Sequence, residues 1–385
     1  MFIHKQYASI GIILTMLIGI FLSQPVLAQD EQYVDEINYE IPQVQQDKFY
    51  KATVIEEPTE ETITEYGQSS LIQHINLIIQ NGPDTGKELK LNFDILQGSP
   101  KNARLKKSDK VIVGKSFFGG EETFYISDIY RLPSLWVLLG MFIFFVLLLA
   151  RWAGLRALIG LLISFSVIIW FIVPRIINGQ NALIIGFVGT IVIATASLFI
   201  AHGFRSRTAI AFVSTLITIT TALLLSIFFT NIMHLFGLGS EEAFYLQTTP
   251  ENLLNLRGIL LAGIIIGTLG VLDDITTAQA AVVEELHRAN TSFKFRELYN
   301  RASSVGREHI ISLVNTLILA YTGASLPLLL LFQIYERPAW LVLNSEIIME
   351  EVVRMLMGST ALILAVPLTT GLAAWYYSAR HAKQK

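Results

Sequence analysis

Residues 258–274 have the sequence Gly258-Ile-Leu-Leu-Ala-Gly-Ile-Ile-Ile-Gly-Thr-Leu-Gly-Val-Leu-Asp-Asp274. No charged side chain interrupts this stretch until its last two residues, which are both aspartates. A membrane-spanning helix needs about 20 mostly apolar residues, so the stretch predicts such a helix with two carboxylates at one end. Ionised groups are costly inside a membrane, and where they occur they are usually functional. Asp273 and Asp274 are therefore the first candidates for a functional site.

The composition extends the membrane prediction to most of the chain. Of its 385 residues, 52% are hydrophobic and only 15% are charged, and the mean hydropathy is +0.53. Residues 134–377 predict an α-helical integral membrane domain with about seven transmembrane helices, and residues 378–385 form the expected cytoplasmic tail. A hinge that contains Arg151, Trp152, Gly154 and Arg156 separates the first two spans. The predicted spans are residues 135–150, 155–173, 182–201, 209–235, 253–272, 310–334 and 352–375.

The N-terminus has the pattern of an export signal. A basic start precedes an apolar segment at residues 8–22, and Ala28 ends a short stretch that is suited to cleavage. Residues 1–28 are expected to be a signal peptide or an uncleaved N-terminal anchor, and both place the following chain outside the cytoplasm. Residues 29–46 are acidic and weakly hydrophobic, which predicts a flexible tether.

Residues 47–131 differ from the rest of the chain, because they are polar and charged with short apolar alternations. In one of these, Leu89, Leu91 and Phe93 alternate with polar residues, which predicts a strand with one buried face. Turn residues at 80–86 precede it. About five strands in this region predict a small extracytoplasmic β-barrel or β-sandwich domain. The expected strands are residues 50–55, 71–79, 89–95, 111–113 and 124–129.

The basic residues of the membrane region predict its orientation. Short cytoplasmic loops are enriched in Lys and Arg. The basic residues of long translocated domains have little influence on orientation, so they are left out of the comparison. With the β-domain outside, the outer loops hold only Arg175 and Arg337, with Arg257 and Arg354 close to the outer ends of spans. The N-terminal domain is therefore expected to be extracytoplasmic and the C-terminus cytoplasmic. The basic residues on the inner side are Arg151, Arg156, Arg205, Arg207, Arg288, Lys294, Arg296, Arg301, Arg307, Arg380, Lys383 and Lys385.

Simple counts argue against several classes of function. The formal net charge of −3 offers no basic excess for binding a nucleic acid. The chain contains no cysteine, which excludes disulfides and thiol chemistry. A Gly-rich phosphate loop is also absent from the sequence, so ATP-driven work by this chain is not expected. No cofactor is predicted.

The aspartate pair has a structural explanation and a functional one. Residues 276–290 contain no Gly or Pro and predict a helix, so an aspartate just before it would cap its first turn. Neighbouring side chains on a helix diverge by about 100°, so capping explains one aspartate but not both. Asp274 is closer to the helix start, which favours Asp273 as an ion or proton site. Whether that ion is a metal stays open.

Other polar groups are candidate supports of this site. Asn315, in the next span, is predicted to hold the ion together with the aspartates. Glu350 and Arg354 are one helical turn apart, and an ion pair at the outer edge of the last span is their favoured explanation. Arg257 is expected to anchor its helix at the interface or to pair with Glu350 or Glu351. The remaining supports are Gln279 and Glu284, and the expected packing glycines are Gly263, Gly267 and Gly270.

The third and fourth predicted spans are rich in hydroxyl side chains. Such groups usually bond back to carbonyls of their own helix. The alternative is that they line a polar pathway together with Asn315. The residues are Thr190, Thr195, Ser197, Ser214, Thr215, Thr218, Thr220 and Thr221.

Three motifs carry a resemblance to a known family: Gly267-x-Leu-Gly270-x-x-Asp273-Asp274-Ile-Thr276-x-x-Gln279, Glu284-Glu285-Leu286 and Ala302-Ser303-x-x-Gly306-x-x-His309-Ile310. With them, the chain resembles the YibE/F-like family of bacterial membrane proteins over the membrane region and much of the β-domain. This resemblance implies a multi-pass protein of the bacterial plasma membrane. It implies no mechanism.

The layout is also similar to that of the proton-driven SecD/SecF group. An aspartate ends one span, a helix ending in Glu284-Glu285-Leu286 follows, and the next span contains Asn315. Two features depart from that group: extra spans precede the motif, and no basic residue follows the acid before His287. The likeness supports an alternative function only by analogy.

Three classes of function stay open. An ion-coupled transporter or permease is favoured, because it explains an acidic pair at a membrane boundary. An enzyme is not the favoured class, although the aspartates of a membrane enzyme would hold Mg²⁺ for chemistry on a phosphorylated lipid. A sensor or assembly factor would bind a partner through the outer β-domain. The expected partners are the lipid bilayer, an unknown small solute, and a protein partner or second copy of the chain.

Overall fold

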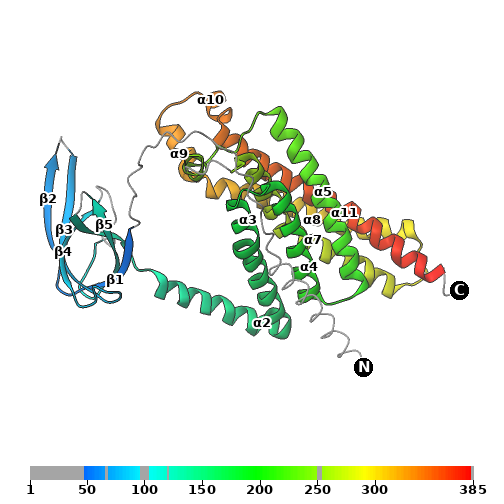
Figure 1. The fold of residues 1–385 in the computed structure, drawn as a ribbon. Coiled ribbons are helices and arrows are strands. Elements are labelled where there is room, and N and C mark those ends of the chain that lie inside the picture. The colour runs from blue at the N-terminus through cyan, green and yellow to red at the C-terminus, as the bar shows by residue number, and fades with distance from the viewer. Residues whose placement is uncertain (1–46, 66–67, 96–103, 119–120, 249–253, 383–385) are drawn as a thin grey trace, which may run out of the picture. The chain divides into compact units, whose positions relative to one another are not determined.

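The protein consists of two compact units, which are described in turn (Figure 1). One unit contains the strands and the start of helix α2 up to Phe145, and the other contains the helices from Val146 onward. The expected signal peptide (1–28) and tether (29–46) lie outside the described part of the chain. The computed structural model describes residues 47–65, 68–95, 104–118, 121–248 and 254–382.

The strands of the first unit form one antiparallel sheet, with six strands among the described residues. Their order is β2-β3-β1-β5-β6. The long strand β3 pairs with β4 along one edge and with β2 and then β1 along the other. Because β4 also contacts β6, the sheet curls into a half-barrel. The strands are β1 (Lys48–Val54), β2 (Thr59–Glu65), β3 (Gln68–Ile79), β4 (Glu88–Ile95), β5 (Lys110–Phe118) and β6 (Glu121–Ile129).

The apolar faces of these strands form the core of the first unit. Ala52 and Val54 of β1 are buried, and they lie opposite Val111 of β5 and Leu77 of β3, respectively. The alternating apolar residues of β4 pack against this core, which confirms their predicted period of two.

The sequence predicts only five strands, because β2 shows no apolar alternation. Its residues are Thr-Glu-Glu-Thr-Ile-Thr-Glu, in which Ile63 is the only apolar side chain. β2 nevertheless pairs with β3 over its whole length. Backbone hydrogen bonds hold such a pair, and they do not depend on side-chain polarity. The outcome is one curved sheet instead of a closed barrel or a two-sheet sandwich.

The second unit is a bundle of helices around α7, which contacts α4, α5, α8 and α11 (Figure 1). Its core includes Leu269 and Leu272 of α7 together with Ala361 and Ala365 of α11. Helix α11 also packs on α5 and α8. Among the described residues, the helices are α2 (Leu132–Val167), the π-helix η2 (Ile168–Ile172), α3 (Val173–Ile177), α4 (Ala182–His202), α5 (Ser206–Ile232), α6 (Glu241–Gln247), α7 (Leu256–Ala289), α8 (Phe295–Ala324), α9 (Leu326–Ile334), α10 (Ala339–Leu343) and α11 (Glu346–Ala382).

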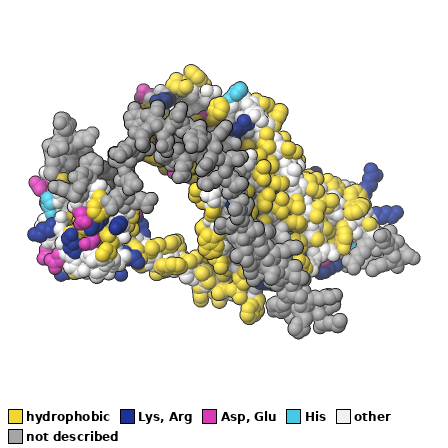
Figure 2. All heavy atoms as spheres, viewed as in Figure 1, with side chains coloured by type: hydrophobic (Ala, Val, Ile, Leu, Met, Phe, Trp, Pro, Cys, Tyr) yellow, Lys and Arg dark blue, Asp and Glu magenta, His cyan; other side chains and the backbone are white. Residues whose placement is uncertain are grey.

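Among the described residues, five helices are long and apolar enough to cross a membrane. A sixth span results if α8 and α9, which are bent by 58°, are counted together. Leu132–Ile177 counts as one span of 46 residues, although the backbone of Arg151 (φ 49°, ψ −128°) is not helical. Hydrophobic side chains cover much of the visible side of the helices (Figure 2). The helical, largely apolar architecture is confirmed, and the count of seven spans is not.

Helix α7 differs from the prediction at the aspartates. The sequence predicts a helix that starts after Asp274, but α7 is unbroken there. Its N-cap is Asn255, whose side chain accepts a hydrogen bond from the N–H of Gly258 at 2.9 Å. Both aspartates lie in the helix interior, so the capping explanation is wrong. Ile275 and Val283 continue the buried face beyond the aspartates, which explains why the helix does not break.

Candidate functional site

The two aspartates of α7 lie in different surroundings. Asp273 is half-buried, whereas Asp274 is exposed. Adjacent residues diverge by about 100° around a helix, so only one of the two faces a given neighbour. The hydroxyls of Thr276 and Thr277 donate back to the carbonyls of Leu272 at 2.9 Å and Asp273 at 2.8 Å. Helices tolerate such bonds with at most a slight bend, so α7 carries both aspartates without interruption.

Ser197 of α4 contacts the carboxylate of Asp273. The hydroxyl of Ser197 donates to Oδ2 of Asp273 at 2.5 Å. The other carboxylate oxygen, Oδ1, is buried and has no hydrogen-bond partner among the described residues. A buried carboxylate oxygen that lacks a partner is energetically costly. The arrangement is therefore suited to bind a proton or a cation at Oδ1.

A cavity of about 300 Å³ lies beside Asp273, between the second half of α2, η2, α4 and α7. Both aspartates line it, as do the hydroxyl residues Ser164 and Ser197. A water molecule occupies about 30 Å³, so the cavity has room for several waters or a small solute. The rest of its wall is apolar and consists of Ala157, Leu161, Phe165, Ile168, Ile193, Ile266, Leu269 and Gly270.

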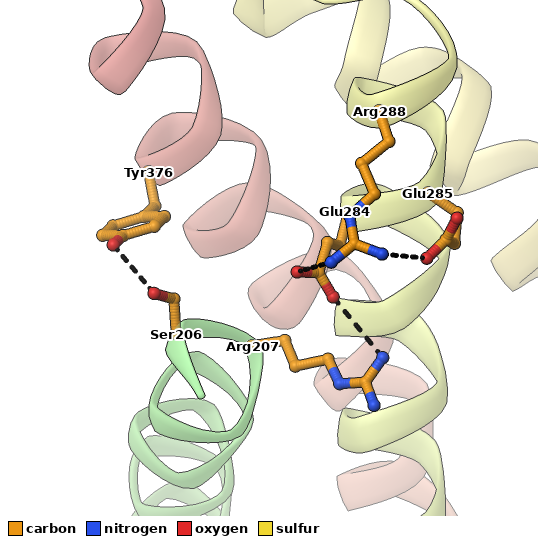
Figure 3. Close-up of polar contacts among 6 residues, drawn as sticks. All are labelled: Ser206, Arg207, Glu284, Glu285, Arg288 and Tyr376. Carbon is orange, nitrogen blue, oxygen red and sulfur yellow. Dashed lines mark hydrogen bonds and ion pairs between the residues drawn. The ribbon is translucent and has the colours of Figure 1, made fainter. Parts of the chain in front are cut away.

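A network of ion pairs lies near the C-terminal end of α7 (Figure 3). Glu284 pairs with Arg288 at 3.0 Å and with Arg207 of α5 at 3.4 Å. Arg288 also pairs with Glu285 at 3.1 Å. Glu284 follows Asp273 by three helical turns, which is about 16 Å along the axis. Glu284 therefore links α7 to the start of α5 and does not share an ion site with the aspartates.

Gln279 is a buried residue that joins three helices. Its side-chain nitrogen donates to the carbonyl of Ala302 on α8 at 3.0 Å and to the hydroxyl of Thr370 on α11 at 2.7 Å. A Cβ atom at Gly306 would approach the side-chain nitrogen and oxygen of Gln279 to 3.1 and 3.2 Å. The motif residues Gln279 and Gly306 thus form a close contact between α7 and α8, away from the cavity beside Asp273.

Glu350 and Arg354 do not form the expected ion pair. Arg354 pairs with Glu351 at 3.2 Å. Glu350 is buried and accepts a hydrogen bond from the backbone N–H of Gly239 at 3.0 Å. One turn earlier on α11, Glu346 accepts from the backbone N–H groups of the residues just before Gly239. These glutamates hold the loop between α5 and α6 on α11.

Arg257 and Asn315 lie away from the aspartates. Arg257, near the start of α7, donates to the hydroxyl of Thr230 on α5 at 3.2 Å. In the described chain, it forms no ion pair with either glutamate that was expected to contact it. Asn315 is exposed on α8 and is not one of the residues that line the cavity. The structure thus brings Ser197, and not Asn315, to the carboxylate of Asp273.

The glycines that the sequence marks for packing share an exposed face of α7. A Cβ atom at Gly263 or Gly270 would have no atom within 4 Å, and one at Gly267 would meet only the hydroxyl of a tyrosine, at 3.3 Å. The close approach of α7 to α4 instead involves Gly186, where a Cβ atom would meet that of Ala262 at 2.4 Å. Within the chain, α7 therefore packs on α4 through the face that contains Ala262, and not through the face with these three glycines.

Most of the hydroxyls in α4 and α5 bond back to their own helix, as expected, by donating to the carbonyl four residues earlier. Three pairs instead join helices: Ser197 with Asp273, Thr215 with Thr276 at 2.9 Å, and Ser206 with Tyr376 of α11 at 3.0 Å (Figure 3). The back-bonded residues are Thr190, Thr195, Thr218, Thr220, Thr221, Ser226 and Thr230.

Ser197 is the partner of Asp273 that sequence reasoning does not assign. The sequence places it among the hydroxyl residues, but it lies 76 residues from Asp273, and only the packing of α4 on α7 joins the two. Within the described residues, no group of three or more His, Cys, Asp or Glu side chains that could hold a metal ion occurs.

A family model described as YibE/F-like protein matches residues 138–379. The matched range contains the helices that form the cavity and both aspartates. It does not include the β-sheet, so the expected resemblance over much of the β-domain is not reproduced. No curated protein and no solved structure matches the chain.

Proposed function

The chain belongs to the YibE/F-like family, and from this premise we propose that it is an ion-coupled transporter or permease. In this proposal, Asp273 binds the coupling proton or cation. The cavity beside Asp273 admits water or the transported solute, and Ser197 positions the carboxylate.

The proposed membrane arrangement has seven spans. A continuous helix of 46 residues would be about 69 Å long, which is more than twice the hydrocarbon thickness of about 30 Å. We therefore assign two spans to Leu132–Ile177, divided at Arg151. Helices α4, α5, α7 and α11 supply four more, and the bent pair α8–α9 supplies the last. The basic residues then place the β-sheet outside and the C-terminus in the cytoplasm.

The observation that carries the proposal is the unpartnered Oδ1 of Asp273. Its carboxylate lies on a largely apolar cavity, and the described chain provides only one hydrogen bond to it, from Ser197. An ionised carboxylate in such surroundings is unfavourable unless a proton or cation compensates its charge. Ion coupling requires a charged group that binds and releases a compensating ion. A carboxylate inside a membrane protein is such a group.

The proposal requires that an ion compensates the charge of Asp273. It does not require a particular conformational cycle. The competing functions are a SecD/SecF-like proton-driven accessory protein and a sensor or assembly factor that acts through the outer sheet. The first of these also needs a titrating carboxylate, whereas the second does not. Ion flux therefore separates the transporter and the sensor, and solute uptake separates the transporter from a proton-driven accessory protein.

The test is ion flux in reconstituted liposomes. Purified full-length protein is inserted into liposomes that contain a fluorescent dye sensitive to H⁺, Na⁺ or K⁺, and a gradient of the matching ion is imposed in each case. We expect a protein-dependent dye response with at least one gradient, and none in protein-free liposomes. The absence of flux under all three gradients would favour the sensor or assembly factor. Turnover of phosphorylated lipid by the same preparation in detergent would instead favour a membrane enzyme.

A further inference from the structure

A second cavity, of about 200 Å³, lies where the end of α4, the start of α5 and α7 meet. Outside α7, its lining residues are His202, Arg207 and Thr208, and each carries a group that donates hydrogen bonds. The other lining residues belong to α7 and are Thr277, Ala278 and Ala281. No carboxylate lines this cavity in the described part of the chain, in contrast to the cavity beside Asp273.

The start of α5 lies at this cavity, because Arg207 and Thr208 line it. The first N–H groups of any α-helix have no partner within the helix. The N-cap of α5 is Arg205, whose side chain forms no capping hydrogen bond. The Arg205 side chain therefore accepts no hydrogen bond from the N–H groups of Ser206, Arg207 and Thr208. Exposed N–H groups and the positive end of the helix dipole favour an anion at such a position.

Thr208 provides an independent indication of a ligand. Only 1% of its surface is exposed, and its hydroxyl is buried without a hydrogen-bond partner among the described residues. A buried hydroxyl that makes no hydrogen bond costs about 1–3 kcal/mol. Other buried threonines of α5, such as Thr218 and Thr230, bond back to carbonyls of their own helix. A ligand with acceptor oxygens in the cavity would satisfy the Thr208 hydroxyl.

Arg207 is the cationic group that lines this cavity. Arg207 is only weakly engaged: its distance to Glu284 is 3.4 Å, and Glu284 has a closer partner in Arg288 at 3.0 Å (Figure 3). A guanidinium has five N–H donors, so Arg207 keeps donors for a ligand. His202 lies within electrostatic range of Arg207 and Arg156, and Asp274 is the acidic group that acts on it. The carboxylates of Asp274, Glu284 and Glu285 offset Arg207, Arg156 and Arg288, so the attraction for an anion comes from the donors that Arg207 keeps and not from a net positive charge.

We propose that the cavity lined by His202, Arg207 and Thr208 binds a phosphate group, either of a free phosphate or of an anionic lipid headgroup. A tetrahedral phosphate offers several acceptor oxygens, which suits a cavity lined by a guanidinium and a hydroxyl at the start of a helix. Sulfate has the same geometry and serves as a chemical mimic. The proposal is independent of the function assigned to Asp273, because its test measures binding and not flux.

The experiment uses the full-length protein in two settings. In detergent, inorganic phosphate is titrated while binding is followed by calorimetry. In nanodiscs, the thermal unfolding midpoint is compared between phosphatidylglycerol and phosphatidylcholine. Free phosphate binding in detergent identifies a soluble ligand. Stabilisation by phosphatidylglycerol alone identifies a lipid headgroup.

Two variants locate the site. Thr208→Val keeps the shape of the side chain and removes only a hydroxyl that has no partner, so folding should be preserved. Arg207→Gln removes the charge. Each is expected to weaken phosphate binding about tenfold or more, the effect of one hydrogen bond to a charged group, or to abolish the stabilisation by phosphatidylglycerol.

The matched controls are Thr218→Val and Arg205→Gln, which remove a back-bonded hydroxyl of α5 and an exposed neighbouring charge. Both should bind like the wild type. The proposal is overturned if neither phosphate nor phosphatidylglycerol has an effect on the wild type. It is also overturned if Thr208→Val and Arg207→Gln bind as well as their controls.

Discussion

Asp273 and Asp274 are adjacent, yet the helix turns them toward different surroundings. Asp273 contacts Ser197 and retains an unpartnered oxygen, whereas Asp274 is exposed at the cavity edge. Because neither is an N-cap, the preference for Asp273 no longer depends on Asp274 being the better cap. It depends on burial: a half-buried carboxylate requires compensation, and an exposed one is compensated by water.

His74, in the sheet, provides a pH-dependent test at the residue scale. Its ring nitrogens lie 3.0 Å from a carboxylate oxygen of Glu61 and 2.8 Å from the side-chain oxygen of Asn92. The hydrogen bond to Glu61 raises the pKa of His74 above 6.5, and the one to Asn92 raises it further. Protonation of His74 therefore stabilises the sheet below pH 6.5, and this contribution is lost as the pH rises through the higher folded pKa.

An NMR titration of residues 47–131 tests this prediction, because His74 is the only histidine in that segment. We expect a pKa above 6.5 that falls in Glu61→Gln and is unchanged in the control Glu57→Gln. A value at or below 6.5 in the wild type would contradict the cross-strand pairs of His74.

At this scale, the sequence identifies Asp273 but not its partner. The charge-free run before Asp273 makes it conspicuous, because local composition is visible in a single sequence. The bond to Ser197 and the pairing of Glu351 with Arg354 depend on how helices rotate and pack. Helical spacing makes Glu350 and Glu351 equally eligible partners of Arg354, and only the position of the loop at Gly239 decides between them.

At the scale of elements, α7 shows how packing determines a helix end. Two adjacent aspartates followed by threonines look like a helix start in sequence. The apolar face nevertheless continues beyond them, and α5, α8 and α11 cover it. Burial of that face outweighs the local capping preference, which is worth only about 1 kcal/mol. β2 cannot be predicted from apolar periodicity for a different reason, because backbone pairing with β3 holds it in the sheet.

A pair of glycine substitutions tests the packing face of α7. Gly186→Ala places a Cβ atom 2.4 Å from that of Ala262, so α4 and α7 must separate. Overpacking of this kind costs about 1–3 kcal/mol, and the thermal unfolding midpoint in detergent should fall. Gly263→Ala introduces a methyl group with no atom within 4 Å and should leave the midpoint unchanged. Destabilisation by Gly263→Ala would mean that this face packs against another copy of the chain.

The loop between α5 and α6 provides a second test among elements. One carboxylate oxygen of Glu346 accepts from the N–H groups of Phe236 (2.6 Å), Gly237 (3.1 Å) and Leu238 (3.3 Å). Glu346→Ala removes this acceptor, and the loss is expected to be about 1–3 kcal/mol of unfolding free energy. The control Glu351→Ala breaks a partly exposed ion pair and should cost at most about 1 kcal/mol. Equal midpoints for the two variants would show that the loop is not held by Glu346.

For the whole molecule, composition alone predicts a helical membrane region and a separate β-unit, because apolar and polar residues are strongly segregated along the chain. The number of spans is harder to predict. It depends on whether the helix that starts at Leu132 turns back at Arg151, where the sequence predicts a hinge and the backbone φ is positive.

Cysteine labelling tests the proposed orientation, and the natural chain provides a cysteine-free background. Thr85→Cys lies in the exposed turn between β3 and β4, and Thr291→Cys lies in the exposed turn between α7 and α8. On intact cells, a membrane-impermeant maleimide should label the first variant only. Thr291→Cys should react after permeabilisation. Labelling of Thr291→Cys on intact cells would contradict the orientation.

The most direct test of the central claim is ion flux in liposomes that contain the Asp273→Asn or the Asp274→Asn protein. Asn keeps the shape of the side chain and removes the charge, and equal thermal unfolding midpoints would confirm that both variants are folded. We predict that Asp273→Asn abolishes the flux seen with the wild type and that Asp274→Asn retains most of it. Wild-type flux through Asp273→Asn would contradict the assignment of Asp273 as the coupling site.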